Sequence, residues 1–146
     1  LSHSLDPVTG LLPDPDDGAC VLASTGLSHM GFTNGRLLKV CRGRVSPALE
    51  IPFAIEVNDR SIPQSTPFFG MARGRAGQVW LVSYGVLYRL SSPSDAHPAK
   101  IALPKLKRFG GLSMSRDIPG VVIMRTDVNW ARSVSGYTPL VVSTED

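Results

Sequence analysis

The apolar segments of this chain are short, and none keeps a helical period over about twelve residues. Runs rich in Val, Leu, Ile and aromatic residues alternate instead with turn residues, and the runs at residues 78–84, 86–90, 120–126 and 138–143 are expected to be strands. The run at residues 78–84 is almost continuously apolar, which predicts burial on both of its faces. The 14 glycines and 12 prolines are spread along the chain, so they separate these runs from one another. Short runs between turn residues are typical of all-β domains. The sequence therefore predicts an all-β fold, a sandwich or a partly closed barrel of about nine to eleven short strands with little helix.

The start of the chain differs from the rest. Proline and glycine interrupt every regular pattern in residues 1–18, which are expected to form an irregular arm. Residues 19–146 are expected to form a single β domain, because a chain of 146 residues is close to the commonest domain size. No window of about 18 residues is apolar enough to predict a membrane span, and the sequence indicates no compartment.

Two local signals predict turns between strands. Asn34-Gly35 lies between two apolar runs, and Asn-Gly is the strongest signal for a two-residue β-hairpin, since both turn positions need positive φ. Asn58-Asp59 is the second predicted turn. Before it, residues 49–57 alternate with period two and are expected to form one strand. Pro52 lacks an N–H, so this strand is expected to lie at a sheet edge or to contain a bulge.

Two segments of the chain resemble each other. Residues 18–26 and 77–85 share Gly, Leu, Ser and Gly at the same places, and residues 120–127 fit more loosely. The second copy, Gln78-Val79-Trp80-Leu81 followed by Gly85-Val86-Leu87-Tyr88-Arg89, resembles one stretch of a blade in sensor-type and tectonin-type β-propellers. The resemblance implies β-propeller-like blades as an alternative to the sandwich, in which the chain is a piece of a propeller or completes a ring with copies of itself.

The two cysteines, Cys20 and Cys41, sit in strand-like runs. They are interpreted as small buried hydrophobes, or as a disulfide if their strands are neighbours. The three carboxylates of residues 14–17 precede a glycine, as in calcium loops, but the twelfth position counted from Asp14 is Thr25 rather than Glu. A solvated acidic turn is favoured, and the sequence predicts no metal and no cofactor.

A hydrolase is the catalytic alternative. It would need a Ser or Cys nucleophile beside a histidine base, and such pairs form across a fold rather than along the chain. His29 and His97 are the candidate bases, with Ser24 or Ser28 as candidate nucleophiles. Residues 26–31 miss the GxSxG pattern by one position, and no phosphate-binding loop or HExxH pattern is present. The sequence therefore favours a non-catalytic protein.

Two basic segments are the candidate binding sites. Residues 70–77 are rich in glycine and carry Arg73 and Arg75, which could hold an anion, although an inter-strand loop is favoured. The second segment combines cations with an aromatic ring and contains Lys100, Lys105, Lys107, Arg108 and Phe109. Such a combination would suit a nucleic-acid backbone and a stacked base. The net charge of +3 is only mildly basic, so nucleic-acid binding is an alternative and not the first hypothesis.

The sequence favours an interaction module that binds a protein or peptide partner as part of a larger protein or assembly. Short strands and loops present a surface, and an extended peptide would add to an exposed sheet edge such as the one near residues 49–57. A homo-oligomer is a further hypothesis, in which the arm of residues 1–18 reaches a neighbouring subunit. It predicts a discrete oligomer in solution.

Overall fold

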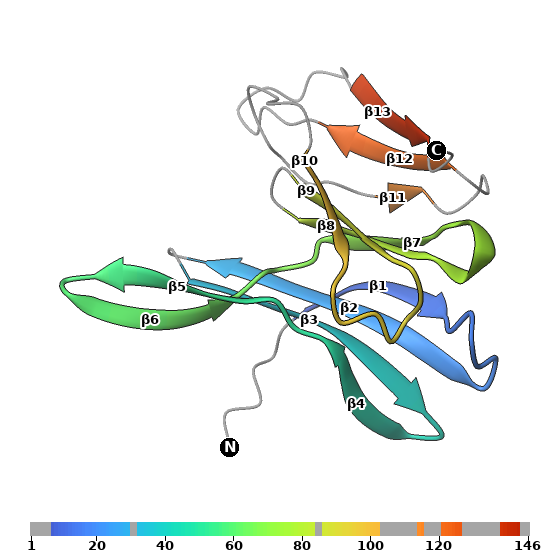
Figure 1. The fold of residues 1–146 in the computed structure, drawn as a ribbon, viewed down its shortest axis with the longest axis horizontal. Helices are drawn as coiled ribbons and strands as arrows, with labels where there is room; N and C mark the ends of the chain where they lie inside the picture. The colour runs from blue at the N-terminus through green and yellow to red at the C-terminus, as the bar shows by residue number, and fades with distance from the viewer. Residues whose placement is uncertain are drawn as a thin grey trace.

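The computed structural model describes residues 7–29, 32–83, 86–102, 114–115, 121–126 and 138–143. Within these residues the chain is nearly all strand, with one short 3-10 helix, η1 (Arg75–Gly77) (Figure 1). The strands are β1 (Val8–Pro13), β2 (Cys20–His29), β3 (Phe32–Cys41), β4 (Arg44–Leu49), β5 (Pro52–Val57), β6 (Arg60–Ser65), β7 (Gly70–Arg73), β8 (Val79–Ser83), β9 (Val86–Leu90), β10 (Ala99–Ala102), β11 (Met114–Ser115), β12 (Val121–Thr126) and β13 (Thr138–Ser143). The prediction of an all-β fold is confirmed.

Antiparallel pairing of neighbouring strands builds every sheet. The first ten strands form two four-stranded sheets, β1-β2-β3-β4 and β10-β9-β8-β7, and the two-stranded sheet β5-β6 between them in the chain. A third stacked sheet has the order β11-β12-β13. None of the sheets formed by the described strands closes into a barrel. The packing of β1–β4 on β7–β10 is consistent with the predicted sandwich.

The core lies between these two four-stranded sheets. Leu22 and Leu37 project from β2 and β3, and Leu81 from β8; all three are fully buried. Phe68, on the segment that leads into β7, packs edge-on against Tyr88 with ring centroids 6.0 Å apart. Every residue of β8 is buried, which confirms the prediction that this run is covered on both faces.

The two segments that resemble each other in sequence form equivalent strands. Residues 18–26 contribute to β2 and residues 77–85 to β8, the second strand of each four-stranded meander. The looser copy contains β12, the second strand of the third sheet in chain order. The internal similarity therefore follows the strand order of the stacked sheets.

The predicted turn at Asn58-Asp59 is confirmed. It joins β5 to β6, and both of its residues have positive φ, 49° and 59°, as a type I′ turn requires. A second turn of this kind, Arg42-Gly43 with φ of 49° and 77°, joins β3 to β4. Glycine alone signalled that turn in the sequence, because arginine rarely adopts positive φ.

The predicted turn at Asn34-Gly35 is wrong. Both residues lie inside β3, and β2 pairs with β3 from Cys20↔Cys41 to His29↔Phe32 without a break at this point. Neither residue has positive φ. Gly35 faces Gly26 across the two strands, so the glycines serve another purpose than a turn.

Gly26 and Gly35 lie where another segment of the chain crosses the β2–β3 pair at close range. The chain leaving β6 passes over the β2–β3 pair, where Phe68 N–H donates to the Thr25 carbonyl at 3.1 Å. A Cβ at Gly26 would overlap with the Phe68 backbone, and one at Gly35 with that of Thr66. Only glycine permits this approach, and the crossing segment is remote in sequence, so a local turn signal could not reveal it.

Two further expectations need correction. Residues 1–18 are not irregular throughout, because β1 pairs with β2. The pairing register shifts between Val8 and Gly10, and Pro13 is the last residue of the strand.

Residues 49–57 are not one strand: β4 ends at Leu49, and β5 starts at Pro52 in another sheet. The break follows from Ile51, whose carbonyl accepts the N–H of Thr66 rather than continuing a ladder.

Candidate functional site

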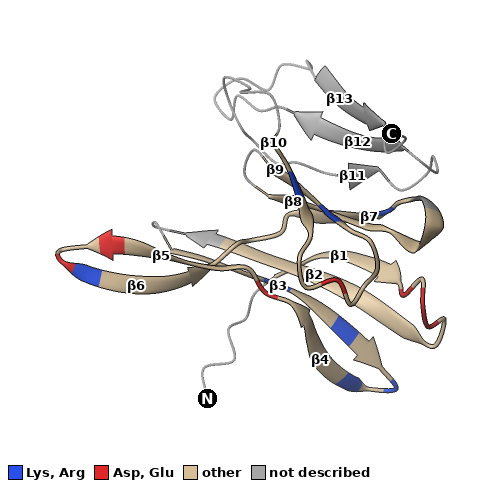
Figure 2. Cartoon of the chain, in the orientation of Figure 1, with Lys and Arg blue, Asp and Glu red and all other residues tan. Residues whose placement is uncertain are grey.

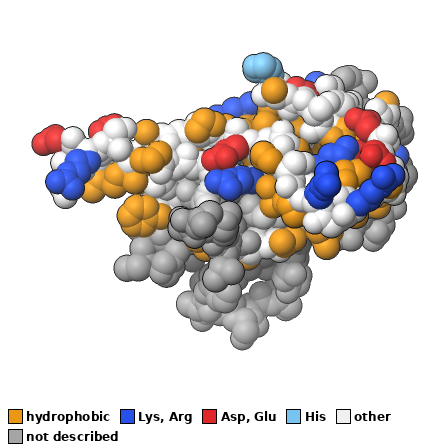
Figure 3. Space-filling model, turned by 90° about the horizontal axis from the view of Figure 1, so that it is seen from below, with side chains coloured by type: hydrophobic (Ala, Val, Ile, Leu, Met, Phe, Trp, Pro, Cys, Tyr) orange, Lys and Arg blue, Asp and Glu red, His pale blue; other side chains and the backbone are white. Residues whose placement is uncertain are grey.

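The β5–β6 hairpin forms an arm that extends from the stacked sheets (Figure 1). Among the described elements, β5 has extensive contact with β6 alone, whereas β6 also contacts β3. One face of the arm carries Phe53, Ile55 and Val57, with Ile62 opposite Ile55. Phe53 and Val57 are about two-fifths exposed. Hydrophobic side chains are visible along this arm in Figure 3, with charged side chains at its tip.

Buried polar contacts fix the root of the arm on β3. The backbone N–H of Thr33 donates to the side-chain carbonyl of Gln64. The Ser65 hydroxyl accepts the Gly35 N–H at 2.9 Å and donates to Asn34 Oδ1 at 2.6 Å. Gln64 and Ser65 are both buried, so these bonds replace lost water contacts. An isolated two-stranded hairpin is only marginally stable in water, and this root holds the arm in place.

The backbone of β5 offers a free edge. A two-residue turn makes Val57↔Arg60 a hydrogen-bonded pair, and the pairs then alternate along the hairpin. The N–H and C=O groups of Ala54 and Glu56 consequently point away from β6. On the opposite edge the position facing Ala54 is Pro63, in the middle of β6, which has no N–H to offer. Pro52, at the start of β5, is also at an outward position without an N–H, so the open part of the β5 edge runs from Ala54 to Glu56. The β6 edge is interrupted in its middle.

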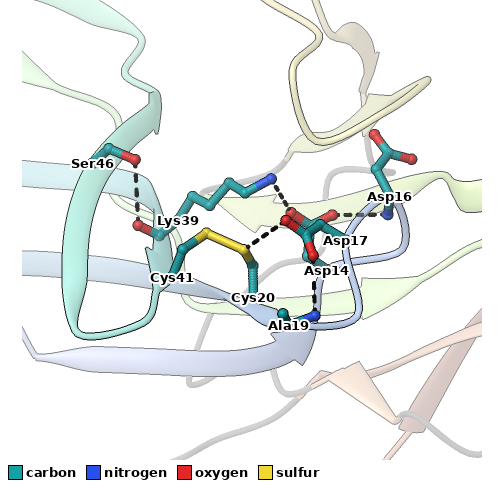
Figure 4. Close-up of a disulfide and its surroundings, with 8 residues drawn as sticks. All are labelled: Asp14, Asp16, Asp17, Ala19, Cys20, Lys39, Cys41 and Ser46. Carbon is teal, nitrogen blue, oxygen red and sulfur yellow. Dashed lines mark hydrogen bonds and ion pairs between the residues drawn. A yellow bond between two sulfur atoms is a disulfide. The ribbon is translucent and has the colours of Figure 1, made fainter.

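A second cluster of polar groups lies at the far end of the β1–β4 sheet (Figure 4). Cys20 and Cys41 form a disulfide between directly opposed residues of β2 and β3, with 4.5 Å between their Cα atoms. That spacing is typical of a non-hydrogen-bonded pair. On the same face, Lys39 Nζ lies 2.6 Å from Asp14 Oδ2, and the Asp14 side chain is fully buried.

The ion pair changes the pKa values of both partners. Burial alone raises the pKa of Asp14, but the Lys39 ammonium and the N–H groups of Asp16 and Asp17 outweigh it, so the pKa is lowered. The pKa of Lys39 is raised by its hydrogen bond to Asp14. In the loop after β9, the N–H groups of Ser91 and His97 lower the pKa of Asp95. The acidic turn of residues 14–17 is thus only partly solvated, because Asp14 is buried and paired.

An open pocket of about 320 Å³ borders this cluster and is lined by Asp16, Lys39, residues 46–48 and residues 93–94. Among the described residues that line it, Lys39 is the only basic one, and its ammonium is already paired with Asp14. The Asp17 carboxylate and both cysteine sulfurs lie within 4.8 Å of one another. The sulfurs are bonded to each other, so neither is the thiolate that would bind a metal or attack a substrate.

Ser24 and His97, the candidate hydrolase residues whose side chains are described, lie in different parts of the fold. Ser24 is buried, and its hydroxyl lies 3.0 Å from the Thr9 hydroxyl. His97 is exposed in the loop after β9, where its backbone N–H donates to Asp95. His29 and Ser28 lie in β2, opposite Phe32 and Thr33 of β3. Both cysteines are in the disulfide, so neither has the free thiol that a cysteine nucleophile would need.

The predicted basic residues fall on different parts of the fold. Lys100 is exposed on β10, opposite Tyr88, and Arg73 is exposed at the end of β7. Arg75 begins η1. The remaining members of the cluster, Lys105, Lys107, Arg108 and Phe109, lie outside the described residues. The basic residues that are described are scattered over several strands in Figure 2.

The segment of residues 70–77 is not the loop that was favoured from its composition. Its first half is strand β7, paired with β8. Gly74 then packs against the indole of Trp80, where a Cβ would lie 2.6 Å from Nε1, and its N–H donates to the Gln78 carbonyl at 2.9 Å. The glycine therefore serves close packing on an aromatic ring, and nothing in the composition separated this from flexibility.

No family model, no curated protein and no solved structure matches this chain. In the described part of the chain, no helix has the length and apolar character needed to cross a membrane. The sequence predicted an exposed edge near residues 49–57 but not its separation into a hairpin arm, because these residues were expected to form one strand. The signal that could have found it is Pro52 together with the turn at Asn58-Asp59, since a proline-started strand and a tight turn define a separate hairpin.

Proposed function

We propose that this protein is a non-catalytic interaction module that binds an extended peptide segment of a partner protein along β5. The observation that carries the proposal is the open backbone edge of an arm whose side chains are also exposed. An added strand would pair with the free N–H and C=O groups of Ala54 and Glu56, which supply affinity independent of sequence.

The side chains beside this edge supply selectivity. Successive residues of a strand face opposite sides, so Phe53, Ile55 and Val57 share the apolar face of the arm. A peptide added to β5 would place alternate side chains beside them, and apolar or aromatic ones would cover the exposed surface of Phe53 and Val57. Glu56 lies on the other face. The expected ligand is therefore an extended segment with apolar residues at every second position.

The test uses a displayed library of random peptides selected on the folded protein, with affinities then measured on purified variants. Ala54→Pro removes the outward N–H from the β5 edge and is expected to weaken the selected peptides about ten-fold or more. Ser61→Pro is the matched control, because Ser61 faces outward on the β6 edge of the same hairpin. It is expected to leave binding unchanged.

Either of two results would reject the proposal: a library that yields no enriched peptide on the folded protein, or selected peptides that bind Ala54→Pro as tightly as the unaltered chain. Circular dichroism melts of both proline variants check that the hairpin and the body remain folded. Affinity that falls steeply with salt and follows Lys100 would support nucleic-acid binding instead.

A further inference from the structure

Two neighbouring rows on the outer face of the β1–β4 sheet are apolar across all of its strands, whereas the next row of the same face carries Thr25 and Arg36. Residues directly opposite each other share a face, so the pairing register defines two rows that cross the sheet on the side away from the core. These rows are Pro13, Val21, Val40 and Val45, and Leu11, Ala23, Leu38 and Pro47. Neither row contains a polar or charged side chain. This composition differs from the polar outer face that an antiparallel sheet at a protein surface usually has.

Part of this face is open to solvent. Leu11 and Val45 are more than half exposed and Val21 is 39% exposed, whereas Ala23, in the middle of the second row, is buried. The opposite face of the same sheet packs into the core through Leu12, Leu22 and Leu37. The side of the molecule seen from below in Figure 3 carries hydrophobic side chains in patches between charged ones. At these two rows both faces of the sheet thus have the chemistry of a packed face, but no described sheet covers the outer one.

The order of the sheets indicates what fits this face. β7 contacts both β1 and β11, so the first strands of the three larger sheets lie next to one another. Figure 1 shows these sheets as a stack, with β1–β4 at one end and β11–β13 at the other. Meanders stacked face to face with their first strands side by side are the arrangement of blades in a β-propeller. Among the described residues, no further sheet packs on the outer face of β1–β4, which is at one end of this stack.

We infer that the outer face of β1–β4 packs against the β11–β13 sheet of a second copy of this chain. The two ends of the stack are different surfaces, so the contact is head to tail, and such contacts close into a ring when the rotation allows it. Two copies would stack six of these sheets, within the usual four to eight blades of a closed propeller. The inference does not rest on peptide binding at β5, because the arm lies outside the two rows.

The experiment measures the mass of the intact chain in solution by light scattering and sedimentation. It covers about 1 to 100 µM, the range in which a dimer of micromolar affinity forms. We expect a discrete dimer. Val21→Lys would bury an unpaired ammonium in the contact and is expected to raise the dissociation constant at least a hundred-fold. Val57→Lys is the matched control, because Val57 is similarly exposed but lies on the arm.

A chain that stays monomeric throughout this range overturns the inference, and so does an assembly that grows beyond two copies. A dimer that Val57→Lys disrupts and Val21→Lys does not would place the contact on the arm and also overturn it. Leu11→Lys gives a second test of the face if Val21→Lys does not fold, as judged by its melting curve. Peptide binding is also measured on the Val21→Lys variant. A variant that is monomeric and still binds peptide shows that the dimer contact and the proposed function at β5 are independent.

Discussion

The two four-stranded sheets have the same strand order but are stabilised differently. In the β7–β10 sheet, β8 is covered on both faces and every one of its residues is buried. In the β1–β4 sheet, β2 is buried from Leu22 to Gly26, but Val21 and Leu27 on either side of this stretch are each 39% exposed. The β1–β4 sheet also carries the disulfide and the Asp14–Lys39 ion pair at its far end. A sheet in the middle of a stack is held by burial, whereas a sheet at its end uses cross-links where burial is incomplete.

The sharpest test of this difference compares one substitution in both sheets. Leu81→Ala removes a fully buried side chain from β8 and should lower the free energy of unfolding by about 2–5 kcal/mol. Leu11→Ala removes one that is half exposed on β1 and should change it by about 0.5 kcal/mol or less in the monomer. Urea denaturation at low protein concentration measures both. Equal losses would contradict the contrast between the sheets.

The next largest effect concerns the disulfide. It joins residues 21 apart in sequence, and a loop of this size should contribute about 3 kcal/mol, chiefly by restricting the unfolded chain. The double substitution Cys20→Ala with Cys41→Ala should therefore lower the free energy of unfolding by that amount and lower the unfolding midpoint accordingly. Reductant should reproduce the loss in the unaltered chain and leave the double variant unchanged. A midpoint that does not respond to reductant would show that the cross-link does not stabilise this sheet.

A smaller loss is expected at the crossing that joins the two sheets. Gly26→Ala would force a Cβ into the Phe68 backbone and should cost about 1–3 kcal/mol. Gly18→Ala is the control, since no atom lies within 4 Å of its added Cβ and its φ is not positive. Thermal melts followed by circular dichroism compare the two. A Gly26→Ala variant as stable as the Gly18→Ala control would mean that the crossing segment moves without cost.

The smallest effect is the pH dependence contributed by the ion pair. The pKa of Asp14 is lowered from 3.8 in the folded state, so the unfolded chain binds its proton at higher pH than the folded chain. The stabilisation is complete above about pH 3.8 and is lost as the pH falls through the lower, folded value. For Lys39 the pKa is raised in the folded state. Its contribution to stability is complete below pH 10.5 and is lost as the pH rises through the higher, folded value.

Unfolding measurements between acid and neutral pH check this for Asp14. Asp14→Asn should flatten the fall in stability on the acid side, but not abolish it, because the pKa of Asp95 is lowered as well. If the free energy of unfolding falls as steeply with acid in Asp14→Asn as in the unaltered chain, and the fall disappears on substitution of another carboxylate, then that other carboxylate and not Asp14 causes the pH dependence.

Local patterns predicted several elements correctly. The apolar run at residues 78–84 contains β8, residues 86–90 are β9, and the strands expected in residues 120–126 and 138–143 are β12 and β13. The turn at Asn58-Asp59 was also predicted, since its geometry depends on those two residues alone. The candidate site was predicted less well. An exposed edge near residues 49–57 was expected, but its separation into an arm with one open edge depends on Ile51 bonding to Thr66.

The sequence by itself determined the class of fold, because strand periodicity and turn chemistry act over neighbouring residues. It left open whether Cys20 and Cys41 are joined, since that depends on the register of β2 against β3. It also assigned Gly35 to a turn, although the tertiary structure uses that glycine to let residues 66–68 cross two strands. The stacking of the sheets, the open β5 edge and the uncovered face of β1–β4 were decided only by tertiary structure. Their physical reason is common to all: each depends on contacts between segments far apart in the chain, which no local pattern encodes.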